Sequence, residues 1–282
     1  MSLPHTTLID AGYVASWSGE RKLVIVDCRF SLRDVEAGRA AWREATIPGA
    51  VYAHLDEDLS GPVVPGTTGR HPLPDVDRFA ALLGSWGVDG DTQVVAFDDM
   101  GGPFAARLWW MLRYVGHDTV AVLDGGLAAW EGSGHPTAPG APPSASATFA
   151  PNVRPQMLAT TADVVAALDD PEVALLDARS AARYRGEQET TDPVAGHIPT
   201  AISAPFVDNL APDQRFLPTA PQRRRFRALL AGAPSARAIC YCGSGVTACH
   251  NLLAIEMTGQ PMPRLYVGSW SEWITDPTRP RE

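Results

Sequence analysis

Short apolar runs alternate with longer amphipathic stretches along the whole chain. Apolar runs begin at residues 22, 93, 173 and 237, and each has the length of a buried strand. Residues 103–116 and 246–259 instead have the length and composition of helices. This alternation predicts an α/β fold built from mainly parallel sheets flanked by helices.

The same landmarks recur in the same order in the two halves of the chain. Two of the runs end in Asp-x-Arg, and two later segments carry a tryptophan at corresponding places, Trp130 and Trp273. The matched segments, first half with second, are residues 22–29 with 173–179, 45–55 with 196–206, 93–99 with 237–243, and 123–134 with 266–277. Four ordered matches predict a duplicated domain.

A segment rich in Pro, Ala, Ser and Gly separates the halves. Such a composition favours extended, semi-rigid chain over a packed core, so residues 136–155 are predicted to be a linker. The chain of 282 residues is long enough for two cores. We therefore expect an N-terminal domain over residues 1–135 and a C-terminal domain over residues 156–282.

Overall charge narrows the classes of partner. The net charge is −9, so no basic face is expected for nucleic-acid phosphates or anionic lipids. No basic segment followed by an apolar run opens the chain, and no apolar stretch reaches the length of a membrane span. We expect a cytoplasmic protein that acts on small molecules or proteins.

Candidate chemistry centres on Cys242, which stands where a predicted strand becomes a predicted helix. In open α/β sheets this edge hosts the ligand site. Gly243 and Gly245 allow the backbone to turn N–H groups inward, and these groups with the helix N-terminus favour a thiolate. We predict that Cys242 is a nucleophile.

The other cysteines are expected to be structural. Cys240 lies inside the strand, Cys249 lies on the following helix, and Cys28 follows a strand without a glycine loop. Cys240-x-Cys242 lacks the two-residue spacer of a zinc knuckle and has no second pair. We expect no metal and no cofactor.

On these residues the chain resembles tandem-domain sulfurtransferases of the rhodanese family. The loop at 242–247, CGSGVT, is similar to that of members using 3-mercaptopyruvate, whereas thiosulfate-using members carry basic residues there; the segments DGGLAAW and GSWSEW resemble the family's domain endings. The resemblance implies two rhodanese-like domains and an inactive first repeat, with Asp98 in the place of the cysteine. It also implies a persulfide on the cysteine and a loop that surrounds the substrate, formed by Gly243, Gly245, Val246 and Thr247.

The resemblance also implies residues from outside the loop. Arg183 matches the arginine that holds the substrate anion, and Arg185 is a further candidate. The second arginine of mercaptopyruvate-using members is missing, because Thr190 or Thr191 stands there. A Ser-His-Asp relay is implied at Ser244, His71 and Asp56, with Asp58 as the alternative to Asp56.

The expected activity is transfer of sulfur from 3-mercaptopyruvate, through the persulfide, to a thiol such as thioredoxin or a small dithiol, or to cyanide. Two alternatives stay open: a thiosulfate:cyanide sulfurtransferase, and a non-enzymatic redox-sensing or binding module in which Cys240 or Cys249 resolves oxidised Cys242. Phosphatase chemistry needs Cys-x5-Arg, and Ala248 stands at that arginine's place. The sequence does not identify the donor, the acceptor, the oligomeric state or the pathway.

Overall fold

The computed structural model describes residues 5–17 and 22–282, which form two compact units. The first unit comprises the described residues up to Gly61, Pro74–Arg154 and Asp213–Arg215. The second comprises Pro62–Leu73, Pro155–Pro212 and Phe216–Glu282. Part of the N-terminal segment considered for localisation, residues 1–4, lies outside the described residues. The domain limits at residues 135 and 156 stay a prediction.

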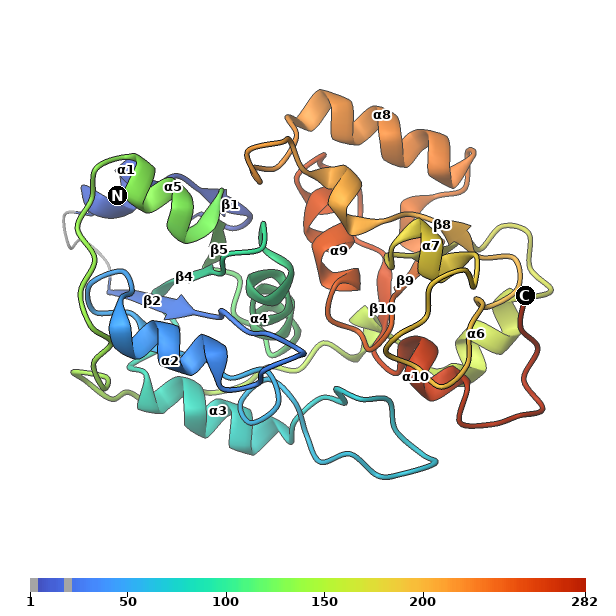
Figure 1. The fold of residues 1–282 in the computed structure, drawn as a ribbon, viewed down its shortest axis with the longest axis horizontal. Helices are drawn as coiled ribbons and strands as arrows, with labels where there is room; N and C mark the ends of the chain where they lie inside the picture. Colours follow the sequence, from blue (N-terminus) through green and yellow to red (C-terminus); the bar gives the residue numbers. More distant parts are fainter. Residues whose placement is uncertain (1–4, 18–21) are drawn as a thin grey trace. The chain divides into compact units, whose positions relative to one another are not determined.

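The first unit is built on a five-stranded, all-parallel sheet in the order β1-β5-β4-β2-β3 (Figure 1). Its strands are β1 (Leu8–Ile9), β2 (Leu23–Asp27), β3 (Val51–Tyr52), β4 (Gln93–Phe97) and β5 (Val120–Leu123). Its helices are α1 (Ala11–Ala15), α2 (Ala37–Glu44), α3 (Val76–Ser85), α4 (Pro103–Tyr114) and α5 (Gly126–Gly132).

The second unit repeats this sheet with the equivalent order β6-β10-β9-β7-β8, again all parallel. Its strands are β6 (Leu158–Ala159), β7 (Leu175–Asp177), β8 (Ile202–Ser203), β9 (Ile239–Tyr241) and β10 (Arg264–Tyr266). Its helices are α6 (Thr161–Ala167), α7 (Ala181–Tyr184), α8 (Thr219–Leu230), α9 (Ala248–Glu256) and α10 (Ser269–Trp273), with 3₁₀ turns η1 (Pro155–Met157), η2 (Phe206–Asn209) and η3 (Ser235–Arg237). The predicted α/β fold with two similar parallel sheets is confirmed.

The Asp-x-Arg landmark is a buried ion pair in both units. Arg29 binds the Asp27 carboxylate and donates from Nη2 to the Ala45 carbonyl at 2.7 Å. Arg179 binds Asp177 in the same way and donates to the Gly196 carbonyl at 2.7 Å. Each arginine therefore ties the end of a strand to the turn that precedes the next one, which explains why these segments recur together.

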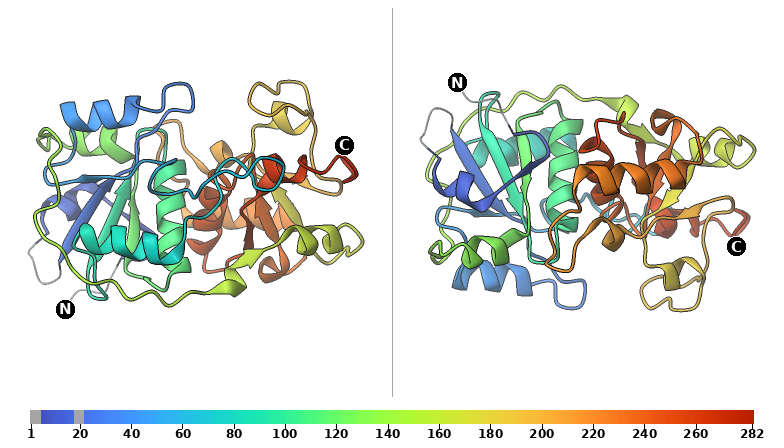
Figure 2. Two further views of the ribbon diagram at one scale, coloured as in Figure 1. Left: turned by 90° about the horizontal axis from the view of Figure 1, so that it is seen from below. Right: turned by 90° about the horizontal axis from the view of Figure 1, so that it is seen from above.

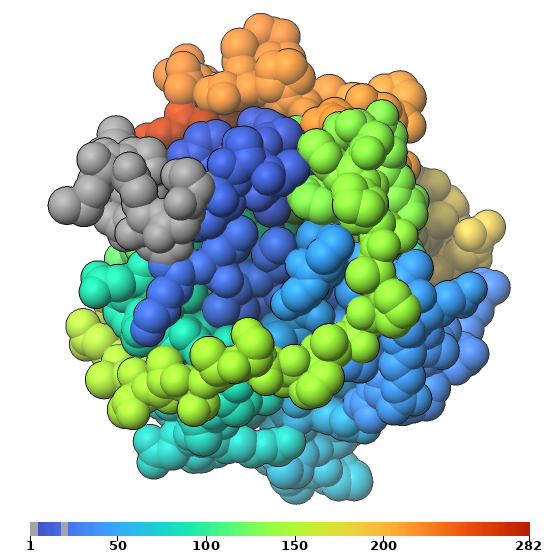
Figure 3. Space-filling view, turned by 90° about the vertical axis from the view of Figure 1, so that its left-hand side faces the viewer, coloured from blue at the N-terminus to red at the C-terminus, as the bar shows by residue number. Residues whose placement is uncertain are grey.

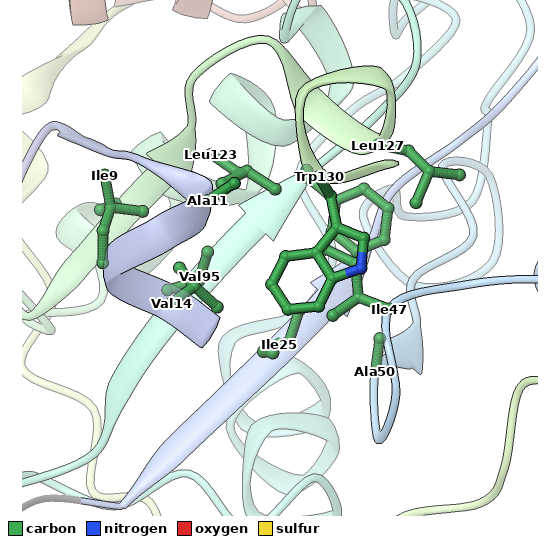
Figure 4. Packing of buried hydrophobic residues seen from close by; sticks show 12 residues of the cluster. Ile9, Ala11, Val14, Ile25, Ile47, Ala50, Val95, Leu123, Leu127 and Trp130 are labelled. Atoms are coloured by element: carbon green, nitrogen blue, oxygen red, sulfur yellow. The ribbon is translucent and has the colours of Figure 1, made fainter. Parts of the chain in front are cut away.

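The repeated tryptophans make equivalent hydrogen bonds in the two units. The indole N–H of Trp130 donates to the Pro136 carbonyl and that of Trp273 to the Pro280 carbonyl, each at 2.8 Å. In the first unit the Trp130 ring packs with Leu127, Ile47 and other apolar side chains (Figure 4). The ring thus buries a large apolar area while its one polar atom stays satisfied.

Helices cover both faces of each sheet. In the first unit α4 lies on one face, and α1 and α5 lie on the other (Figure 2). Trp109 and Trp110 of α4 are fully buried, as expected for core aromatics. Burial on both faces explains why strands such as β4 are continuous apolar runs with no alternation of polar residues.

The predicted linker runs as extended chain over the surface of the first unit (Figure 3). Ala138 pairs with Thr46, and the Ala147 N–H donates to the Gly84 carbonyl at 2.8 Å. Among the described residues, none of the helices combines the length and the apolar character that a membrane crossing requires.

Candidate active site

Cys242 directly follows β9, the middle strand of the second sheet, and lies six positions before the first residue of α9. The residue is 2% exposed. Its backbone N–H donates to Ser269 Oγ at 3.1 Å, and its carbonyl accepts from the Trp270 N–H at 2.9 Å. The start of α10 therefore fixes the loop at the carboxyl edge of the sheet, where the sequence predicted the site.

Three donors surround the Cys242 sulfur. Burial acts most strongly and would raise the pKa of Cys242, but hydrogen bonds from the Thr247 hydroxyl and the N–H groups of Ser244 and Ala248 outweigh it. The pKa of Cys242 is consequently below that of an ordinary thiol. A thiolate is the nucleophilic form of cysteine, so this cradle favours nucleophilic chemistry.

The two loop glycines have different roles. Gly245 has φ +76°, and a Cβ there would lie 2.5 Å from the Val267 carbonyl oxygen, so the loop conformation requires glycine. Gly243 is not in the left-handed region. A Cβ on Gly243 would instead lie 2.9 Å from Arg70 Nη2 and 3.4 Å from Arg183 Nη1 and Nη2. Gly243 leaves room for two guanidinium groups beside the nucleophile.

The corresponding loop of the first unit holds a carboxylate in place of a sulfur. Asp98 accepts backbone N–H groups at 2.8 to 3.0 Å, and the donors are Met100, Gly102, Phe104 and Ala105. Burial nonetheless raises the pKa of Asp98 to about 6. The side chain is 1% exposed and fills the cradle itself.

The remaining cysteines lie in structural surroundings. Cys240 and Cys28 are buried, and burial raises the pKa of each far above that of an ordinary thiol. Cys249 is buried on α9, and its sulfur lies 3.3 Å from the Gly245 carbonyl. A high pKa disfavours the thiolate at Cys240 and Cys28, whereas the surroundings of Cys242 favour it.

His71 and Ser244 meet in the second unit, although 173 residues separate them. His71 Nδ1 lies 2.7 Å from Ser244 Oγ, and both side chains are buried. When the imidazole proton is on Nε2, Nδ1 accepts the serine hydroxyl. Asp56 and Asp58 belong to the first unit, so the third member of the relay stays a prediction.

Arg183 lies over the loop and is held by two buried carboxylates. Its Nε donates to Glu189 Oε2 at 2.9 Å, and its Nη2 donates to Asp192 Oδ2 at 2.8 Å. The Glu189 and Asp192 side chains are only 3% and 2% exposed. The pairing with Glu189 fixes the guanidinium beside Gly243 and does not draw it into solvent.

Arg185 and the two threonines do not reach the loop by any described contact. Arg185 is exposed and pairs with Glu187 through two 2.7 Å hydrogen bonds. Thr190 and Thr191 are exposed. Val246 is buried within the loop. The site therefore gathers the predicted loop residues, Arg183, Ser244 and His71, and leaves Arg185 on the surface.

Arg70 is the site residue that the sequence did not reveal. It belongs to the segment Pro62–Leu73, which is part of the second unit. Its backbone N–H donates to Ser271 Oγ at 3.1 Å, and its guanidinium pairs with Asp192. The available signal was its position directly before His71.

One group among the described residues has the geometry of a metal site, and it lies elsewhere. Oxygen and nitrogen atoms of Glu36, His54 and Glu57 in the first unit lie within 4.8 Å of one another. His54 already bonds the Val35 carbonyl through Nε2 and faces the Asp56 and Glu57 N–H groups through Nδ1. Both ring nitrogens are thus engaged, and this group carries no metal assignment.

Comparisons with known proteins find a matching family and similar chains. The family described as "Rhodanese-like domain" matches residues 10–133 and 160–276. A Pseudomonas aeruginosa protein described as "Probable 3-mercaptopyruvate sulfurtransferase" is 50% identical over 97% of this chain and 96% of its own. The mouse protein described as "Thiosulfate sulfurtransferase" is 33% identical over 89% of this chain and 85% of its own. The crystal structure of the Escherichia coli 3-mercaptopyruvate sulfotransferase SseA has a TM-score of 0.81 at 30% identity, covering 95% of this chain and 100% of that one.

Proposed function

The chain belongs to the rhodanese family, and on this premise we propose that it is a sulfurtransferase that takes sulfur from 3-mercaptopyruvate onto Cys242. The observation that carries the proposal is the buried Cys242 sulfur, surrounded by three donors that lower its pKa. The 50% identity over 97% of the chain to a protein of that description supports the choice of donor.

In the first step the Cys242 thiolate attacks the sulfur of mercaptopyruvate. A sulfur–sulfur bond forms and the carbon–sulfur bond breaks, so the electron pair goes to the three-carbon fragment, which leaves as the enolate of pyruvate and takes a proton. The thiol proton of the substrate stays on the persulfide or passes to water. Arg183 holds the substrate carboxylate during this step, because a guanidinium matches the planar carboxylate.

The relay serves the same step. Ser244 donates its backbone N–H to the Cys242 sulfur, while its hydroxyl faces His71. When the imidazole proton is on Nδ1, the Ser244 oxygen accepts it, and the hydroxyl hydrogen can be donated to the oxygen that becomes negative as the enolate forms. Such positioned donors are strongly favourable in buried sites. Asp56 is proposed to orient His71.

In the second step an acceptor removes the outer sulfur and restores the thiolate. A thiol acceptor, such as thioredoxin or a small dithiol, leaves as a persulfide or closes to a disulfide with release of hydrogen sulfide. Cyanide leaves as thiocyanate. No metal or organic cofactor takes part in the proposed steps. The first repeat is proposed to be non-catalytic, because Asp98 stands in place of the nucleophile and cannot carry transferable sulfur.

Thiosulfate is the second candidate donor. The thiolate would attack its outer sulfur and release sulfite. The identity of 33% to the mouse thiosulfate sulfurtransferase favours this reading, as do the two guanidinium groups near the loop. Against it, the residues after the nucleophile are neutral, so the loop itself brings no charge to balance a dianion.

The experiment compares kcat/KM for mercaptopyruvate and thiosulfate in the wild type, Cys242→Ser and Arg183→Ala. We expect higher efficiency with mercaptopyruvate, no turnover in Cys242→Ser, and one added sulfur atom on Cys242 by mass spectrometry after exposure to the donor alone. Equal or higher efficiency with thiosulfate would reverse the choice of donor. Turnover in Cys242→Ser would refute the proposed mechanism.

A separate pair of variants tests the redox-sensing alternative. Cys240→Ala and Cys249→Ala should both retain sulfur transfer, since the persulfide cycle needs one thiol. A sensor that relies on a resolving cysteine would lose its reversible oxidation in one of them. Reversible oxidation of Cys242 that is lost in one of these variants, in a wild type that transfers no sulfur, would favour the sensor reading.

A further inference from the structure

Two buried carboxylates stand behind the guanidinium groups that lie beside Gly243. Asp192 pairs with Arg70 through Oδ1, and its Oδ2 accepts from Arg183 Nη2 at 2.8 Å. Glu189 Oε2 accepts from Arg183 Nε at 2.9 Å. The Asp192 and Glu189 side chains are 2% and 3% exposed, whereas those of Arg70 and Arg183 are 29% and 21% exposed. A ligand can therefore contact the guanidinium groups directly, and it senses the carboxylates behind them through their charge.

The position of Asp192 is fixed by the segment that carries it. Its backbone N–H donates to Glu189 Oε1 at 2.9 Å, as does the N–H of Thr191. A third arginine, Arg179, lies 3.5 Å from Glu189, but it already forms a buried ion pair with Asp177 at 2.7 Å and so adds no net charge. The charges of the two accessible guanidinium groups are therefore balanced by the two buried carboxylates.

This balance acts differently on the two candidate donors. Mercaptopyruvate brings one negative charge in its carboxylate, whereas thiosulfate brings two. At a given distance, a buried carboxylate repels a dianion twice as strongly as a monoanion, and buried charges are screened little by salt. The loop at 242–247 contains no basic residue that could offset this repulsion. The guanidinium groups can still donate hydrogen bonds to either donor, so the difference in charge decides between them.

We propose that Asp192 is a specificity-determining residue, whose buried charge disfavours dianionic sulfur donors such as thiosulfate relative to donors with a single carboxylate. Glu189 adds to this effect through its ion pair with Arg183. Discrimination of this kind works by penalising the wrong ligand. The inference rests on the proposed function and deepens it, because it gives the choice of donor a physical cause in named residues.

The first test measures kcat/KM for thiosulfate and for mercaptopyruvate in the wild type, Asp192→Asn and the control Asp170→Asn. Asparagine keeps the shape of aspartate and an oxygen that accepts from arginine, and it removes the charge. We expect the ratio of thiosulfate to mercaptopyruvate efficiency to rise on the order of tenfold in Asp192→Asn, as for one charge pair in a partly solvated site. Asp170 pairs with Arg237 before β9 begins, whereas Cys242 follows the end of β9, so Asp170→Asn should keep the wild-type ratio.

The ratio separates a role in specificity from a purely structural one. If Asp192 only held the arginines in place, Asp192→Asn would lower the efficiency with both donors by the same factor. An unchanged or lower ratio would therefore overturn the inference. If Asp192→Asn does not fold, Glu189→Gln takes its place, since it also removes one buried negative charge and keeps an oxygen for the N–H groups of Thr191 and Asp192. The same rise is expected there, and an unchanged ratio would again overturn the inference.

The second test does not depend on sulfur transfer. Sulfate and pyruvate, an unreactive dianion and an unreactive monoanion, are used to protect Cys242 from alkylation by iodoacetamide. The concentration that gives half protection does not depend on how fast the unprotected thiol reacts. In Asp192→Asn this concentration should fall by a larger factor for sulfate than for pyruvate, and in Asp170→Asn it should change for neither. Equal factors in Asp192→Asn would contradict the inference. Absence of persulfide in the wild type would instead contradict the proposed function, so the two failures are distinguishable.

Discussion

Replacing Thr247 by valine tests how the site makes a thiolate. The Thr247 hydroxyl donates to the Cys242 sulfur, and valine has the same shape without the donor. A hydrogen bond to a charged group contributes about 1.5–3 kcal/mol, and one pKa unit corresponds to about 1.4 kcal/mol. We therefore expect the pKa of Cys242 to rise by about one to two units in Thr247→Val.

Thr247→Val should change the pKa of Cys242 and leave the stability of the fold unchanged. Thr247 precedes α9 as its N-cap residue but makes no side-chain capping bond, so valine removes no helix cap. The N–H groups of Ser244 and Ala248 still donate to the sulfur. These two donors should therefore still lower the pKa of Cys242 in Thr247→Val, although by less than in the wild type.

The assay is the rate of iodoacetamide alkylation of Cys242 as a function of pH, followed by mass spectrometry. Below the pKa only the thiolate fraction reacts, so the rate in Thr247→Val should be about 10- to 100-fold lower than in the wild type. The two rates should converge above both pKa values. Thr247→Ser keeps a hydroxyl and is the matched control. An unshifted profile in Thr247→Val, or an equal shift in Thr247→Ser, would refute the assignment.

Three further substitutions follow from the same geometry. Ser244→Ala removes the hydroxyl bound to His71 but keeps the N–H donor, so kcat for mercaptopyruvate should fall about 100-fold while the alkylation profile of Cys242 stays unchanged. Gly245→Ala places a Cβ 2.5 Å from a carbonyl oxygen at φ +76°, and urea unfolding should show a loss of about 1–3 kcal/mol; an unchanged midpoint would contradict the strain. Asp98→Asn turns an amide N–H₂ toward backbone donors, so the first unit should lose about 2 kcal/mol of stability while Cys242 still forms a persulfide.

The sequence was sufficient for the fold because its signals are local and repeated. The apolar runs that became β4 and β9 have no polar alternation, which requires burial on both faces and hence a parallel sheet. The Asp-x-Arg pairs recur because each closes the same connection, from Asp27 to Ala45 in one unit and from Asp177 to Gly196 in the other. A pattern that has the same physical cause in both halves predicts the repeated fold from the sequence alone.

The site could be predicted only in part from the sequence, because its charged side chains come from segments that are far apart along the chain. Cys242, Ser244 and Thr247 lie in one loop, and a strand followed by a glycine-rich turn identifies that loop. Arg70 stands 122 residues before Asp192, and its place depends on the close approach of Gly69 to the start of α10. Composition and periodicity carry no information about such a contact. The predicted role of Arg185 followed from sequence proximity alone, and its side chain instead pairs with Glu187 in solvent.

In both repeats the backbone of the equivalent loop binds an anionic group through inward N–H groups, whichever side chain is present. Asp98 accepts N–H groups from the second and sixth residues after it, Met100 and Phe104, and Cys242 accepts from the corresponding Ser244 and Ala248. In the first unit the Asp98 carboxylate itself occupies the cradle and leaves no reactive atom there. In the second unit the inward N–H groups of the same loop favour a thiolate, and they can also hold the persulfide anion of the proposed cycle. The proposed activity of the second repeat, and the proposed lack of activity in the first, then follow from the side chain that occupies a shared backbone geometry.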